Sequence, residues 1–202
     1  MKVLKFGGTS VGSAENIQRV IDIVLKKLND NQDIAVVFSA MGGVTNQLIA
    51  SGTQAAKGDE TYLELVRQIE EKHFNVIRTL IGVKAQSSVF ANVKGLVNEL
   101  EDLLRGVFLI RELSTRTLDL IVSFGERLST RVIYECLRTR DIDVVFCDAR
   151  ELIKTDAHFG MAKVDFEQTN RNIRAFFKKN KGLALITGFI ASTEKGETTT
   201  LG

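Results

Sequence analysis

The sequence predicts an α/β domain in which a mostly parallel central sheet is covered by helices on both faces, a three-layer αβα sandwich. Apolar runs of strand length occur at 34–38, 144–147 and 183–186. Such continuous runs are typical of strands buried on both faces in parallel sheets. Segments with the apolar spacing of amphipathic helices lie between them. Two of the predicted strands also end in glycine-containing loops that lead into helices, a usual place for ligands in open α/β sheets.

The chain opens with a short apolar strand that carries Lys5 and runs into Gly7, Gly8, Thr9 and Ser10. Two glycines let the backbone turn tightly and bring bare N–H groups close to a ligand. The helix that follows directs its partly positive end to the same place, and Lys5 adds a point charge. This corner therefore predicts a phosphate-binding site, although an ordinary strand-to-helix turn explains the same glycines.

The second predicted strand, 34–38, enters the loop 39–46, which carries Ser39 and Thr45 beside two further glycines. Between the two strands, Ser13 is predicted to cap a helix. Its buried face is predicted from one set of apolar residues, namely Ile17, Val20, Ile21, Val24 and Leu28. The two corners are of one kind and should lie at the same edge of the sheet.

From about 59 to 112 the pattern changes to long helices, which predicts a helical insert in the α/β plan. We expect a helical hairpin that serves as a lid or an interface. His73 lies in this segment without a second ligand beside it, so we interpret it as structural.

Glu126 follows Gly125, and the glycine is predicted to end a helix over 117–124 and start a new one. Two interpretations of Glu126 remain open at this point. It is an acid at a helix N-terminus, where a carboxylate is electrostatically stable, or a carboxylate that receives the ammonium group of an amino-acid ligand.

The C-terminal third predicts a strand, an irregular stretch with an incidental His158, a helix and a strand that ends in Thr187-Gly188-Phe189. A hairpin turn between short strands follows at 194–197. The first three of these segments are 144–147, 152–165 and 166–179. Because the chain stops at Gly202, directly after a predicted strand, we expect it to be part of a longer protein.

The composition excludes several classes of partner. A net charge of +2, from 27 basic and 25 acidic residues, predicts no nucleic-acid partner. No apolar run reaches the ~18 residues of a membrane span, and the sequence shows no signal peptide. Cys136 and Cys147 lie in apolar surroundings, which predicts reduced core thiols in a cytoplasmic protein.

Four separated motifs together resemble the aspartate kinases, which have the amino-acid kinase fold. They are Lys5-Phe6-Gly7-Gly8-Thr9-Ser10, Ser39-Ala40-Met41-Gly42-Gly43-Val44-Thr45-Asn46, Phe124-Gly125-Glu126-Arg127-Leu128-Ser129 and Thr187-Gly188-Phe189-Ile190-Ala191. The resemblance covers essentially the whole chain and includes the kinase portion of bifunctional aspartokinase–homoserine dehydrogenases. It implies phosphorylation of the L-aspartate β-carboxylate by ATP with Mg²⁺, to give 4-phospho-L-aspartate in lysine, threonine and methionine biosynthesis.

The resemblance also implies residue roles. Lys5 would be catalytic, because it neutralises charge on the transferring phosphoryl group. The ATP phosphates would contact Lys5, Gly7, Gly8, Thr9 and Ser10. Aspartate would contact Ser39, Thr45, Glu126, Gly188 and Phe189, with Glu126 taking the α-ammonium group. No protein metal ligand and no protein nucleophile are implied, since the substrate carboxylate attacks.

Family members continue beyond the position of Gly202 with an Arg-Gly-Gly-Ser-Asp stretch, a nucleotide-binding half and regulatory ACT domains. We therefore expect residues 1–202 to be the N-terminal, amino-acid-binding part of an aspartokinase catalytic domain, inactive alone and homo-oligomeric in the full-length enzyme. Two alternatives stay open: another amino-acid kinase (acetylglutamate, glutamate 5- or uridylate kinase) and a non-catalytic amino-acid-binding module.

Overall fold

The computed structural model describes residues 1–28 and 33–201. The predicted chain end at Gly202 lies outside the described residues. The elements, in chain order, are β1 (Lys2–Phe6), α1 (Ala14–Leu28), β2 (Ile34–Phe38), α2 (Val44–Lys57), α3 (Tyr62–Leu80), α4 (Val83–Ile110), α5 (Thr115–Arg138), β3 (Val144–Cys147), α6 (Ala149–Leu152), β4 (Lys154–Thr155), α7 (Phe166–Lys179), β5 (Leu183–Thr187), β6 (Ile190–Thr193) and β7 (Thr198–Thr200).

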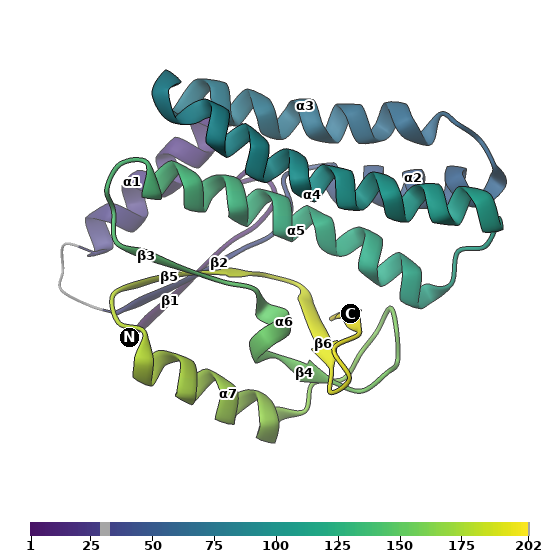
Figure 1. Ribbon diagram of the computed structural model, residues 1–202. Coiled ribbons are helices and arrows are strands. Elements are labelled where there is room, and N and C mark those ends of the chain that lie inside the picture. Colours follow the sequence, from purple (N-terminus) through teal and green to yellow (C-terminus); the bar gives the residue numbers. More distant parts are fainter. Residues whose placement is uncertain (29–32, 202) are drawn as a thin grey trace.

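Within the described residues the main sheet has four parallel strands in the order β1-β2-β5-β3. Because βαβ crossovers are right-handed, α1 and α5 lie on one face of the sheet and α7 lies on the other. Figure 1 shows this layering, with α5 above the sheet and α7 below it. The predicted fold class is confirmed. All described strand pairs of the main sheet are parallel. Strands β4, β6 and β7 form a second, three-stranded sheet, in which β6 and β7 pair antiparallel.

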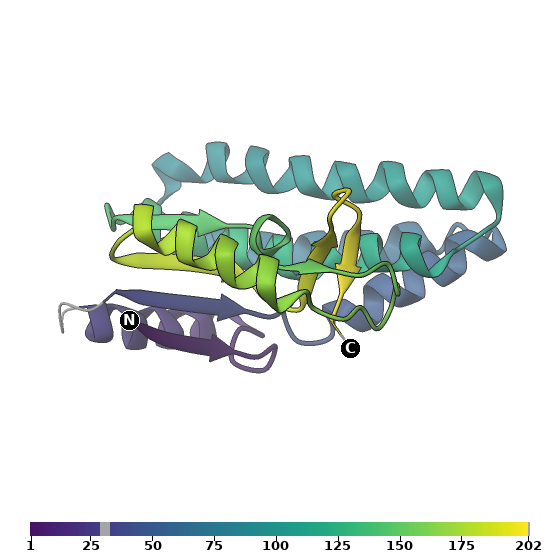
Figure 2. The same cartoon turned by 90° about the horizontal axis from the view of Figure 1, so that it is seen from below.

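Helices α2 to α5 pack together and extend past the carboxyl ends of the strands (Figure 2). The predicted helical insert is confirmed as the antiparallel pair α3 and α4, which we call the insert hairpin. Residues at helical spacing on α4 are fully buried, namely Val89, Val93, Val97, Leu100 and Leu104. They share one hydrophobic cluster with residues of α1, β2 and α5, so this hairpin is part of the core and is not a detached lid.

His73 is fully buried in the insert hairpin, as its structural interpretation requires. Its Nδ1 lies 2.7 Å from the Ile69 carbonyl oxygen. Burial lowers the pKa of His73 to about 4, so the ring is neutral at physiological pH. The two cysteines are buried and free, and burial raises the pKa of each thiol to about 12.

The predicted helix break at Gly125 is wrong. Helix α5 runs without interruption from Thr115 to Arg138, and Glu126 lies near its middle. A Cβ atom on residue 125 would lie 2.7 Å from the Ala40 Cβ and 3.4 Å from the Leu48 Cδ1. The glycine is therefore a close-approach residue between α5 and the loop after β2. The interpretation of Glu126 as a helix-start acid falls with the break.

The stretch 152–165 is more ordered than predicted. It contains the end of α6, the short strand β4 and a bridge between Thr155 and Val164. Asp119 of α5 is buried, and its carboxylate accepts hydrogen bonds from the Gly160 N–H (2.9 Å), the Thr200 N–H (3.1 Å) and the Thr200 hydroxyl (2.7 Å). One carboxylate thus fixes this stretch and β7 to α5.

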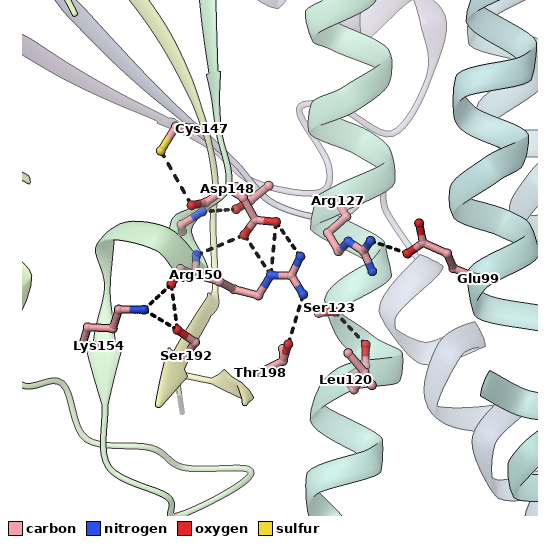
Figure 3. A network of polar contacts seen from close by, with 12 residues as sticks. Glu99, Leu120, Ser123, Arg127, Cys147, Asp148, Arg150, Lys154, Ser192 and Thr198 are labelled. Atoms are coloured by element: carbon pink, nitrogen blue, oxygen red, sulfur yellow. Dashed lines mark hydrogen bonds and ion pairs between the residues drawn. The ribbon is translucent and has the colours of Figure 1, made fainter. Parts of the chain in front are cut away.

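The hairpin of β6 and β7 is also tied to the end of β3. Figure 3 shows Arg150 between Asp148 and Thr198, and Lys154 beside Ser192. The Arg150 guanidinium lies 2.6 Å from an Asp148 oxygen and 3.1 Å from the Thr198 hydroxyl. These bonds hold the β6–β7 hairpin against α6, β4 and the end of β3.

Replacing Gly125 with alanine is expected to destabilise the protein by about 1–3 kcal/mol, because the new methyl group overlaps Ala40. Gly95 of α4 is the matched control, since a Cβ there meets no atom within 4 Å. Gly95→Ala should instead stabilise by about 0.5–1 kcal/mol through helix propensity. Urea unfolding measures both, and equal effects of the two substitutions would contradict the close-approach role.

Candidate active site

A cavity of about 500 Å³ opens at the carboxyl ends of β1 and β2. The cavity is lined by Lys5, Gly8, Ser39, Ala40, Met41, Gly42, Gly43, Thr45, Glu126, Phe189 and Leu201. Six of the ten predicted site residues are among them, drawn from four segments far apart in the sequence. These six are Lys5, Gly8, Ser39, Thr45, Glu126 and Phe189.

The other four predicted residues lie outside this lining. Gly7, Thr9 and Ser10 are exposed on the turn after β1, and Thr9 and Ser10 border a separate hollow of about 240 Å³ with Asn16. Gly188 lies beneath, where its N–H donates to the Phe38 carbonyl oxygen at 2.8 Å. The roles predicted for these residues remain predictions.

Five lining residues were not singled out from the sequence: Ala40, Met41, Gly42, Gly43 and Leu201. The first four belong to the loop between Ser39 and Thr45, so their position in the motif was an available signal. Leu201 had none, because its place depends on the pairing of its N–H with the Phe189 carbonyl oxygen at 2.9 Å.

The loop 39–43, which we call the serine loop, is held to its neighbours by hydrogen bonds. From α5, the Ser129 hydroxyl donates to the Ser39 carbonyl oxygen at 2.8 Å, and Glu126 Oε1 accepts from the Ala40 N–H at 3.0 Å. The Gly42 N–H donates to the Gly8 carbonyl oxygen at 3.0 Å. These bonds fix the loop against α5 and against the first glycine corner.

Glu126 is the buried acidic residue of the cavity lining. Its side chain is only 3 % exposed, and its Oε2 has no hydrogen-bond partner among the described residues. Burial raises the pKa of the carboxyl to about 7, and the Ala40 N–H opposes that shift only in part. Because Glu126 lines the cavity, this desolvated carboxyl group favours a cationic group beside it.

Two positively charged features, the N-terminus of α2 and Lys5, line the same cavity. Helix α2 begins directly after Gly43, which adopts a left-handed conformation with φ of 84° and has no side chain to cap the helix. The first turn of α2 carries no acidic residue, and Gly43 and Thr45 line the cavity, so its partial positive charge attracts anions there. The exposed Lys5 adds a full positive charge.

Phe189 has a strained backbone, with φ of 61°, a region that bulky residues rarely adopt. Its ring is 39 % exposed and borders the cavity. Strain of about 1–3 kcal/mol persists where the surrounding structure enforces it, and it is common at ligand sites. Here the hydrogen bonds of the adjacent Gly188 and Leu201 enforce it.

A second hollow, of about 590 Å³, lies between the start of α5 and the β6–β7 turn. Across it, Arg116 pairs with Glu197 at 3.1 Å, so its charges are matched within the protein. The described residues give it no buried polar atom without a partner. We therefore place the active site at the Glu126 cavity.

The Glu126 cavity can hold a small zwitterion. Its lining combines a desolvated carboxyl group, which attracts a cation, with Lys5 and the start of α2, which attract anions. A sequence model described as the amino acid kinase family matches residues 1–202. The chain belongs to the amino acid kinase family.

Similar proteins in this family are aspartokinases. The chain is 34% identical to lysine-sensitive aspartokinase 3 of Escherichia coli (strain K12) over 208 residues, which are 99% of this chain and 43% of that protein. It is 33% identical to chloroplastic aspartokinase 1 of Arabidopsis thaliana, again over 99% of this chain but 35% of the relative. Among solved structures, E. coli aspartokinase III in complex with aspartate and ADP superposes with a TM-score of 0.88 at 32% identity, over 100% of this chain and 43% of that one.

The chain thus spans less than half the length of these amino acid kinase relatives. Among the residues that the structure describes, no helix is long and apolar enough to cross a membrane. The same part of the chain holds no cluster of three or more His, Cys, Asp or Glu side chains that would form a metal site.

Glu126→Gln is expected to stabilise this amino acid kinase chain at high pH. Because folding raises the pKa of Glu126 to about 7, the protonated group favours the folded state fully below the unfolded pKa, and this contribution is lost as the pH rises through 7. Glutamine stays neutral and keeps an acceptor for the Ala40 N–H. Urea unfolding should show a gain of up to about 3 kcal/mol at about pH 8 and little gain at about pH 4.

Glu135 is the matched control, since it is equally buried on α5 but lies 2.8 Å from Arg138. Glu135→Gln removes one charge of that pair and should destabilise at about pH 8. A destabilising effect of Glu126→Gln at this pH would show that the Glu126 charge is compensated in the folded protein.

Proposed function

We propose that this chain forms the amino-acid-binding part of an aspartate kinase, which transfers the γ-phosphoryl group of ATP to the β-carboxylate of L-aspartate. The observation that carries the proposal is the unpartnered oxygen of buried Glu126 in one cavity with Lys5 and the start of α2. An aspartate α-ammonium group supplies the missing partner of Glu126. Its carboxylates are drawn to Lys5 and to the start of α2, which line the same cavity.

The reaction needs no nucleophile from the protein. A β-carboxylate oxygen of aspartate attacks the γ-phosphorus, the bond from phosphorus to the β–γ bridging oxygen breaks, and ADP leaves with the electron pair. Protein groups contribute positioning and electrostatic stabilisation. Lys5 compensates the negative charge on the transferring group, and Glu126 holds the ammonium group at a fixed point. The phosphates of ATP are assigned to Lys5, Gly7, Gly8, Thr9 and Ser10, and aspartate to Ser39, Thr45, Glu126, Gly188 and Phe189.

The relatives support aspartate over other amino-acid kinase substrates. The structures of E. coli aspartokinase III include a complex with lysine and aspartate and a complex with aspartate and ADP. These ligands are known for that protein, and the similarity over the whole of this chain supports the same substrate here. The rival substrates are N-acetylglutamate, glutamate and uridine monophosphate, and the first experiment below separates them.

The nucleotide side of the site is incomplete in this chain. The chain matches less than half of the E. coli relative. We propose that it supplies the glycine turn after β1, which contacts the ATP phosphates, and that the remainder of the full-length enzyme forms the rest of the ATP pocket. Mg²⁺ enters this proposal as part of the substrate MgATP. The chain alone is expected to bind aspartate without turnover.

The product, an acyl phosphate, is an activated intermediate, and we propose that it serves lysine, threonine and methionine synthesis. Two free buried thiols fit a reducing compartment such as the cytoplasm. Plant relatives are described as chloroplastic. A homo-oligomer remains our prediction for the full-length enzyme.

The complete protein is expected to gain thermal stability in millimolar L-aspartate, because a ligand that binds only the folded state raises the melting temperature. Succinate, which lacks the ammonium group, should give little shift. N-acetylglutamate, glutamate and uridine monophosphate should also give little shift, and a larger rise with one of these would overturn the aspartate assignment. A rise with aspartate but no phosphorylation in the presence of MgATP would favour the non-catalytic binding module.

Binding of aspartate should release protons near neutral pH, since the ammonium group favours the ionised form of a Glu126 whose pKa is about 7 in the free protein. Calorimetry in buffers of different ionisation enthalpy measures this release. Glu126→Gln should abolish the release and weaken aspartate binding about tenfold or more. Release that persists in the glutamine variant would assign the proton to another group.

Lys5→Met should lower turnover in the complete enzyme more than it raises the KM for aspartate, since its charge acts mainly on the transferring phosphoryl group. Lys2, on the same strand and exposed, is the matched control, and Lys2→Met should leave both parameters unchanged. Equal turnover and equal KM in the two variants would show that Lys5 has no catalytic role.

A further inference from the structure

The insert hairpin reaches the active site through Lys72 of α3. Its ammonium nitrogen lies 2.5 Å from the Gly42 carbonyl oxygen in the serine loop. Among residues 1–28 and 33–201, Lys72 forms no ion pair with a carboxylate. Lys94 on the neighbouring helix, by contrast, pairs with Glu70 at 2.8 Å and with Glu101 at 3.6 Å. The Lys72 charge is therefore directed at a backbone carbonyl that borders the cavity.

That carbonyl belongs to the peptide group between Gly42 and Gly43. In a trans peptide the C=O and N–H bonds point in opposite directions. A carbonyl held toward α3 therefore turns the Gly43 N–H away from α3. Within the described part of the chain, no acceptor takes this N–H, and Gly43 borders the cavity with no atom within 4 Å of a Cβ built on it.

An ammonium group at the carbonyl also polarises the peptide, which strengthens its N–H as a donor. We propose that Lys72 is a positioning residue for this site, which fixes and polarises the 42–43 peptide so that its N–H binds an anionic oxygen of the reactants. The inference rests on the proposed function, since it assigns the anion to a substrate carboxylate or to the transferred phosphoryl group.

Packing alone does not require this bond. The buried faces of α2 and α3 meet through residues such as Leu48, Val66 and Ile69, and Gln47 is bonded to Gln68 at 3.1 Å beside them. Lys72 is only half-buried, and its bond leaves the helix pair for the loop. Its specific effect should therefore appear in the serine loop and not in the stability of α3.

Amide hydrogen exchange in the ligand-free complete protein tests the positioning directly. The Gly42 and Val44 N–H groups donate to Gly8 and Met41, so their exchange reports the order of the loop. Lys72→Met should speed both about tenfold relative to the amides of α3. Lys72→Arg, which keeps a cationic donor, should recover part of the protection, and Lys94→Met should leave it unchanged. Equal exchange in the Lys72→Met and Lys94→Met variants would overturn the proposal.

Kinetics of the same variants identifies the anion. An increase of about tenfold in the KM for aspartate at unchanged kcat assigns a substrate carboxylate, and a similar fall in kcat at unchanged KM assigns the phosphoryl group. Parental values of both parameters in Lys72→Met, with parental values in Lys94→Met, would refute the positioning role. If the wild-type protein did not bind aspartate, the proposed function would be wrong. The exchange experiment would still decide whether Lys72 orders the serine loop.

Discussion

The contact of α5 with the serine loop is the constraint on which the site depends. At Gly125 the helix approaches Ala40 so closely that no side chain fits between them. The next residue, Glu126, then reaches the Ala40 N–H, and Ser129 one turn later reaches the Ser39 carbonyl oxygen. Three positions of one helix thus fix how closely the loop approaches α5 and which of its backbone groups are hydrogen-bonded to the helix. The loop is also bonded to the first glycine corner, since the Ser39 N–H donates to the Phe6 carbonyl oxygen at 3.1 Å and the Gly42 N–H to the Gly8 carbonyl oxygen at 3.0 Å.

The fold was predictable from the sequence to the extent that its signals are local. Strands such as Ile34–Phe38 consist of consecutive apolar residues, and helices such as Ala14–Leu28 show apolar spacing together with a Ser13 cap, whose hydroxyl accepts from the Asn16 N–H at 3.3 Å. Both kinds of signal follow from burial on a single element. Gly125 gave a misleading local signal, because a glycine in a helix costs about 1 kcal/mol of propensity and so suggests a break. The tertiary contact with Ala40 outweighs that cost, and no local pattern contains it.

The candidate site divides in the same way. Lys5, Ser39, Thr45 and Glu126 stand out as unusual residues beside glycines, and the structure brings them to one cavity. Lys72 lies on an amphipathic helix among other charged residues, where its sequence context is that of an ordinary solvated face. Only the packing of the insert hairpin against α2 brings it to the Gly42 carbonyl. Residues that act through a backbone group of a distant loop leave no pattern of their own in the sequence.

The distribution of charge in the cavity determines how a ligand must lie. Glu126 is buried against the helix that forms one wall, where desolvation makes its ionised form unstable without a cation. Lys5 is exposed, so water stabilises its charge until an anion arrives. In the proposed function, an amino acid with two carboxylates satisfies both groups when its ammonium group lies beside Glu126 and a carboxylate lies near Lys5 and the start of α2. A dicarboxylate without an amino group would leave Glu126 unpaired and would be repelled by it when ionised. If the proposed function holds, the same buried carboxylate that lowers stability at high pH also favours ligands that carry an ammonium group over simple dicarboxylates.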